Sequence, residues 1–250
     1  MALYVYKKRD NSKKRKAVNY FSYLSLTVGV FLLFWSFYPI LSFEIYSRLF
    51  IQNKIQTPIP KSAVISSLEK ATSILGSFDV FSNNLRDFTN VNLWFPDANQ
   101  NIETKKLMSK EYFISIPKLN INNAQVVVGG EDLTKSLIHF LPRSLPGEYG
   151  NVVIFGHSTL PQLYNPKDYK TIFTYLSSLE KNNRMYIKMN DVQYEYEVYD
   201  MFVVNPDQVS VLEEKTDASY LTLITCVPPG TYWKRLVVRA KLTKLPGSLN

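Results

Sequence analysis

The chain has 250 residues, and its 29 Lys and Arg against 21 Asp and Glu give a formal net charge of +8. Seven of these basic residues and one acidic residue lie in the first 17 positions, which leaves a nearly neutral remainder. The positive charge therefore reflects the amino-terminal end and does not indicate a nucleic-acid partner. Two histidines and one cysteine exclude a zinc cluster of the usual spacing.

The amino-terminal region has the pattern of a membrane anchor. No residue from 18 to 43 is charged, aromatic residues stand at both ends of this stretch, and about 20 apolar residues suffice to cross a bilayer. We expect a basic cytoplasmic tail at 1–17 and a transmembrane helix at 18–43, with everything after it outside the cell membrane. A cleaved signal peptide is the rival interpretation. It is disfavoured because the apolar run is long and no small-x-small cleavage site follows it.

The remainder divides into two regions. Residues 44–106 are predicted to form an extracytoplasmic stalk, partly helical, with an amphipathic helix at 62–75. Residues 107–250 are β-rich, with turn signals between short apolar runs, and predict a mainly β, closed barrel of seven to eight strands with short helices in its loops. Helical segments are expected at 134–140 and 169–179. The expected strands are 112–117, 124–128, 151–155, 184–188, 194–204, 221–225 and 236–240.

The lone cysteine closes one of these strands. Cys226 ends the run Leu221-Thr-Leu-Ile-Thr-Cys226, and Arg235 opens the next apolar stretch nine residues later. If the two strands pair as a hairpin, Cys226 and Arg235 face each other across the turn. Arg239 shares that face but lies four residues deeper, about 13 Å along the strand, so Arg235 is the better placed arginine.

A thiol, an imidazole and a guanidinium together can build a cysteine transpeptidase or hydrolase. An imidazole can accept the thiol proton and later protonate a leaving amine, while an arginine can stabilise an oxyanion. His157 follows the predicted strand 151–155, whereas His139 lies in an apolar segment where a structural imidazole is expected. The structural alternative remains that Cys226 is a buried small hydrophobe and that His157 and Arg235 are surface residues.

Four ordered segments resemble the sortase family. Thr222-Leu-Ile-Thr-Cys226 is similar to the signature T-L-x-T-C, and Arg235-Leu-Val-Val-Arg-Ala240 to the following R-x-x-V-x-A strand. Upstream, Leu145-Pro-Gly-Glu-Tyr-Gly-Asn-Val-Val-Ile-Phe-Gly-His157 resembles the segment L-P-G-x-x-G-N-x-x-I-x-G-H. Ile114-Ser-Ile-Pro-Lys-Leu-Asn-Ile121 resembles the first strand of the family. The resemblance covers about residues 112–242.

This resemblance implies a sortase-type β-barrel and a membrane-anchored cysteine transpeptidase on the outer face of a bacterial cell. Cys226 would be the nucleophile, His157 the general acid and base, and Arg235 the oxyanion-binding or substrate-binding group. The expected substrates are exported proteins with an LPxTG-like carboxy-terminal sorting motif, and the acceptor is an amine of a peptidoglycan precursor or of a pilin. No cofactor is expected. Some members bind calcium, but the acidic loop residues Glu131, Asp132, Glu213 and Glu214 form no clear pattern for it.

Departures from the family pattern bear on the subclass. The Cys226–Arg235 connection is short and contains Pro228-Pro229, and Phe155 and Ser158 flank the Gly-His pair where small or basic residues are common. Trp94-Phe-Pro-Asp97 is only loosely similar to the lid motif of pilin-building members. These features favour wall anchoring over pilus assembly. An exported cysteine peptidase and a non-catalytic membrane-tethered binding barrel remain as alternatives.

Overall fold

The computed structural model describes residues 12–51, 89–95, 111–140 and 143–244. The side chains of residues 12–15 and 244 lie outside this description. Most of the predicted stalk, including the helix expected at 62–75, also lies outside the described residues. The boundaries expected for the tail, stalk and barrel domain therefore stay predictions.

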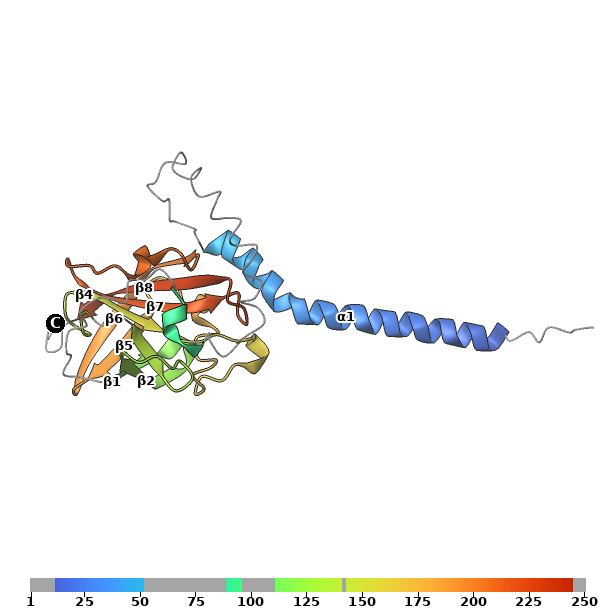
Figure 1. The fold of residues 1–250 in the computed structure, drawn as a ribbon, viewed down its shortest axis with the longest axis horizontal. Helices are drawn as coiled ribbons and strands as arrows, with labels where there is room; N and C mark the ends of the chain where they lie inside the picture. Colours follow the sequence, from blue (N-terminus) through green and yellow to red (C-terminus); the bar gives the residue numbers. More distant parts are fainter. Residues whose placement is uncertain (1–11, 52–88, 96–110, 141–142, 245–250) are drawn as a thin grey trace, which may run out of the picture. The chain divides into compact units, whose positions relative to one another are not determined.

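The amino-terminal region forms one long helix, α1 (Ser12–Phe50), with Pro39 inside it (Figure 1). Its stretch Lys16–Phe50 is long and apolar enough to cross a membrane, and almost none of it is buried. The helix is compatible with the predicted anchor, although a signal sequence can have the same length and composition. Contacts divide the chain into two compact units, residues 1–42 and 43–250.

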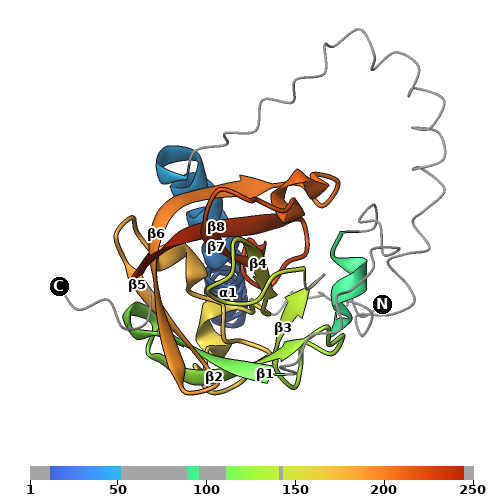
Figure 2. The same ribbon diagram turned by 90° about the vertical axis from the view of Figure 1, so that its left-hand side faces the viewer.

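The second unit contains a closed β-barrel in which the strand order is β1-β2-β3-β4-β7-β8-β6-β5 (Figure 2). Its strands are β1 (Glu111–Ile116), β2 (Ile121–Val128), β3 (Leu137–Phe140), β4 (Gly150–Phe155), β5 (Arg184–Met189), β6 (Val192–Val204), β7 (Ser219–Val227) and β8 (Lys234–Lys244). Two neighbouring pairs are parallel, β2 with β3 and β4 with β7, and the other pairs are antiparallel. The predicted mainly β barrel is confirmed, with eight strands.

Two local predictions are wrong. The helical turns expected at 134–140 are replaced by strand β3, which pairs parallel to β2 and antiparallel to β4. The helix expected at 169–179 is a series of turns with a single 3-10 turn, η8 (Leu176–Ser178). The other described 3-10 turns are η5 (Val91–Leu93), η6 (Pro117–Leu119), η7 (Pro161–Leu163) and η9 (Val209–Leu212).

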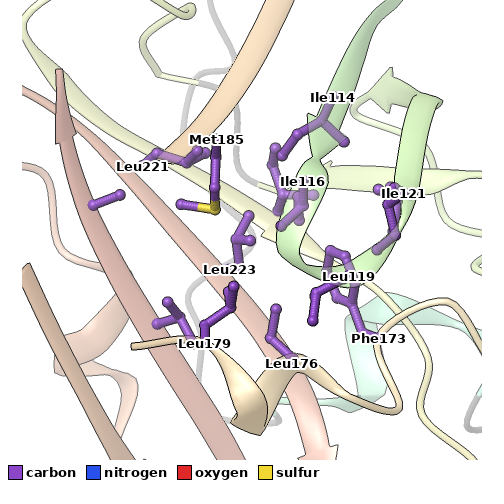
Figure 3. Close-up of a cluster of buried hydrophobic side chains, with 14 of the residues drawn as sticks. Ile114, Ile116, Leu119, Ile121, Phe173, Leu176, Leu179, Met185, Leu221 and Leu223 are labelled. Carbon is purple, nitrogen blue, oxygen red and sulfur yellow. The ribbon is translucent and has the colours of Figure 1, made fainter. Parts of the chain in front are cut away.

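Alternation along the strands creates two buried clusters. The larger fills the barrel interior, where Ile114 of β1, Met185 of β5, and Leu221 and Leu223 of β7 converge (Figure 3). Residues on the opposite face of the same strands, such as Ile224 of β7, belong to a second cluster. Because successive strand residues point to opposite faces, Leu223 faces the interior while Ile224 and then Cys226 belong to the outer-face cluster.

Candidate active site

Cys226 and Arg235 lie directly opposite each other in the β7–β8 hairpin. The predicted hairpin is thereby confirmed, and its register places Arg239 opposite Thr222 instead. Both side chains of the Cys226–Arg235 pair are about 1% exposed. Arg235 donates from Nη1 to the carbonyl oxygen of Tyr232 at 2.9 Å, which fixes the guanidinium at the open end of the hairpin. A thiol and a cation therefore share one buried strand end.

His157 reaches the same end of the barrel through a different strand. β4 pairs parallel to β7 with Phe155 opposite Ile224, and the Gly156 N–H donates to the carbonyl oxygen of Ile224 at 3.2 Å. Since parallel strands end on the same side, the residue after Gly156 lies beyond the end of β4, as Cys226 lies at the end of β7. The His157 ring is largely buried, and its Nε2 atom has no hydrogen-bond partner among the described residues.

Two hydroxyl groups join these strand ends. Thr225 Oγ1 donates to the carbonyl oxygen of Gly156 at 2.7 Å. Ser158 Oγ donates to the carbonyl oxygen of Cys226 at 2.5 Å. Thr225, the neighbour of Cys226, thus binds the backbone next to His157. Ser158, the neighbour of His157, binds the backbone of Cys226 itself.

Trp94 covers the site. Its ring is fully buried, 5.3 Å from the Arg235 guanidinium and 5.6 Å from the His157 ring between centres. Its carbonyl oxygen accepts a hydrogen bond from Arg235 Nη2 at 3.1 Å. Trp94 follows the 3-10 turn η5, and backbone bonds hold this segment against Glu131 and Leu133. Sequence reasoning treated residues 94–97 only as a loose lid motif and did not place Trp94 on these groups. Asp97 lies outside the described residues.

Burial keeps both candidate reacting groups neutral. It raises the pKa of the Cys226 thiol to about 11, and the Arg235 charge opposes this only partly. Burial also lowers the pKa of His157 to about 4, with Asp132 raising it and Lys170 lowering it by smaller amounts. At neutral pH the covered site therefore contains a thiol and a neutral imidazole rather than an ion pair.

His139 lies in the barrel interior, away from this strand end. It shares a face of β3 with the interior residue Leu137, and its ring packs edge-on against Tyr112 with centres 5.9 Å apart. In the part of the chain that the structure describes, neither ring nitrogen has a hydrogen-bond partner, and burial lowers the pKa of His139 to about 3. This surrounding fits a structural imidazole.

Two of the acidic loop residues accept hydrogen bonds from neighbouring groups. The Asp132 carboxylate accepts from the backbone and hydroxyl of Thr134, and Glu214 Oε1 accepts from the Asn151 N–H. Within the described ranges, no group of three or more His, Cys, Asp or Glu side chains is arranged to hold a metal ion.

The model of the sortase domain matches residues 114–243, just over half of the chain. This chain belongs to the sortase family. The match includes the strand ends that carry His157, Cys226 and Arg235, and the barrel described above is the one expected for a sortase. Members of this family are cysteine transpeptidases.

Individual sortases resemble part of the chain. Sortase D of Bacillus subtilis (strain 168) is 26% identical over 133 residues, which are 51% of this chain and 61% of that protein. Sortase A of Bacillus anthracis is 28% identical over 146 residues, 58% of this chain and 64% of that protein. The chain thus spans less than two thirds of these relatives. A solved structure of sortase A from Corynebacterium diphtheriae covers 77% of this chain and 88% of its own, at 25% identity and a TM-score of 0.48.

Proposed function

We propose that this sortase cleaves an LPxTG-like sorting motif, holds the acyl part as a thioester on Cys226 and transfers it to an amine acceptor of the cell wall. The observation that supports this most is the convergence of Cys226, His157 and Arg235 on one end of the β4–β7–β8 sheet. Nucleophile, proton carrier and oxyanion donor are the three groups that acyl transfer requires.

The pKa values of Cys226 and His157 determine which group carries the proton before substrate binds. Because the thiol pKa is far above that of the imidazole, the thiolate–imidazolium pair is a minor form before substrate binds. In the proposed reaction, His157 accepts the Cys226 proton as Sγ attacks the threonine carbonyl carbon of the motif. The imidazolium then protonates the leaving glycine amine as the carbon–nitrogen bond breaks. An incoming amine reverses these steps: it attacks the thioester, and its proton passes through His157 back to the thiol.

Arg235 gives the oxyanion its donors. Its Nη2 atom is bound to the Trp94 carbonyl oxygen in the covered site. The carbonyl oxygen of the bound motif would replace the Trp94 carbonyl oxygen as the acceptor of this hydrogen bond. The guanidinium would then stabilise the tetrahedral intermediate. Trp94 must therefore withdraw from His157 and Arg235 before a sorting motif can bind.

The same proposal includes the location. Helix α1 would anchor the protein in the cell membrane with its basic tail in the cytoplasm and the barrel outside, where sorting motifs and wall precursors are found. The acceptor is proposed to be an amine of a peptidoglycan precursor, because the short Cys226–Arg235 connection favours anchoring over pilin polymerisation. A pilin lysine would be the acceptor in the alternative.

Mass spectrometry of the full chain with an LPxTG-like peptide tests the proposal. We expect an acyl adduct on Cys226 that an added amine such as triglycine releases as a new amide. The Cys226→Ala variant should fold normally, by circular dichroism, and form neither adduct nor product. Transfer by Cys226→Ala would refute the assignment. Exclusive hydrolysis with the amine present would instead identify a peptidase, and absence of both reactions a binding barrel.

A further inference from the structure

The two hydroxyl bonds between the ends of β4 and β7 form a reciprocal pair. Thr225 Oγ1 donates to Gly156 O, just before His157, and Ser158 Oγ, just after His157, donates to Cys226 O. The parallel ladder itself ends at Phe155 and Ile224, with one further backbone bond from Gly156. The hydroxyl groups thus continue the connection between the two strands past the point where the ladder ends.

No hydrogen bond joins the candidate reacting groups themselves. His157 Nε2 has no partner, and no hydrogen bond to the Cys226 thiol occurs within the described residues. Their separation must therefore be set by the backbone that carries each of them. Removing a tie between these two backbone segments changes that separation without removing either reacting group.

Ser158 holds one side of the His157 segment. The other side is held by the loop at 171–174, because Phe173 N–H donates to the His157 carbonyl oxygen at 2.9 Å and Thr159 N–H donates to Thr174 Oγ1 at 3.0 Å. The hydrogen bond from Ser158 at 2.5 Å is the tie that acts on the backbone of Cys226 itself. Loss of this hydroxyl would leave the His157 segment attached to the loop and, through Gly156, to β7, but without a tie to Cys226 itself.

We propose that Ser158 is a positioning residue that sets the distance between the His157 imidazole and the Cys226 thiol. This proposal rests on the proposed function, since it assumes that these two groups exchange a proton. Ser158 forms no hydrogen bond with either reacting atom within the described residues and acts through the Cys226 carbonyl. Substrate binding through Arg235 does not depend on the tie, whereas proton transfer depends steeply on distance.

The variants Ser158→Ala, Ser158→Thr and Thr222→Val of the full chain in detergent separate this role from a purely structural one. Thr222 is the matched control: its hydroxyl is hydrogen-bonded to Asn151 Oδ1 at 2.6 Å and joins the same two strands, four residues from Cys226. We expect kcat for peptide transfer to fall about 10- to 100-fold in Ser158→Ala, with KM within about twofold of wild type. Ser158→Thr should restore kcat, and Thr222→Val should lower only the urea midpoint.

A second measurement needs no sorting peptide. The pH dependence of Cys226 alkylation by iodoacetamide reports how well His157 stabilises the thiolate, and the apparent pKa should rise in Ser158→Ala but not in Thr222→Val. An unchanged kcat and alkylation profile in Ser158→Ala, or a failure of Ser158→Thr to restore them, would overturn the positioning role. If wild type transfers no peptide, the proposed function fails, and the alkylation profile still decides the role of Ser158.

Discussion

The barrel interior and the outer-face site each bury an imidazole, but only the second imidazole lies at a strand end. His139 is enclosed by the strands of a closed barrel and packs against Tyr112. His157 lies at a strand end and is covered by Trp94, which comes from a short segment outside the barrel. Burial and a lowered pKa are common to both histidines. What distinguishes the candidate site from the structural group here is a cover that comes from outside the barrel strands.

The largest effect is expected at Arg235. Substitution there tests whether the reaction depends on the end of the β7–β8 hairpin or on the outer face of the barrel in general. Arg235→Lys should lower kcat/KM for peptide transfer by about 100-fold or more, because an ammonium cannot reproduce the planar donors of the guanidinium. Arg239→Lys is the matched control on the same face of β8, opposite Thr222 and over the Phe202 ring. Steady-state kinetics of both variants measure the difference. Equal losses in the two variants would contradict a special role for the Cys226–Arg235 pair.

The second prediction concerns the interior histidine and pH. The folded pKa of His139 is about 3, below its ordinary value near 6.5, so only the unfolded chain takes up this proton as the pH falls. Keeping His139 neutral in the folded state therefore stabilises the protein above pH 6.5, and this stabilisation is lost progressively towards pH 3. Lowering the pH from 7.5 to 4.5 should reduce the free energy of unfolding by about 2–3 kcal/mol through His139.

Urea denaturation at these two pH values measures that loss. His139→Leu should remove about 2–3 kcal/mol of the pH dependence seen in wild type. Met185→Leu, a volume-conserving change in the same interior, should keep it. If the free energy of unfolding of His139→Leu depended on pH as strongly as that of wild type, burial would not hold the interior imidazole neutral.

The smallest expected effect concerns the cover. Trp94→Ala removes the ring that contacts Arg235 and His157, so Cys226 should be alkylated and acylated about tenfold faster in single-turnover experiments. Leu93→Ala, in the adjoining 3-10 turn and about half exposed, is the control and should leave both rates unchanged. Slower acylation in Trp94→Ala would instead make the ring part of the peptide-binding surface.

Much of the barrel could be predicted from local sequence patterns. The two wrong predictions, at residues 134–140 and 169–179, have a common cause. Apolar spacing over residues 169–179 favours a helix, but Phe173, Leu176 and Leu179 enter the barrel interior from turns (Figure 3). β3 has only four residues, all buried, and gains its hydrogen bonds from β2 and β4. In both segments tertiary packing outweighs local propensity, so no local pattern indicates the observed structure.

The sequence by itself determined the pairing of Cys226 with Arg235, because a short turn and strand alternation set the register of two neighbouring strands. It also determined, through four ordered segments, the family to which the chain belongs. Only the tertiary structure decided what else meets this pair. Ser158 binds Cys226 from 68 residues away, and the Trp94 carbonyl binds Arg235 across 141 residues. Such contacts depend on the parallel β4–β7 pairing and on barrel closure, and pairing between distant strands leaves no periodic signal in the residues that make it.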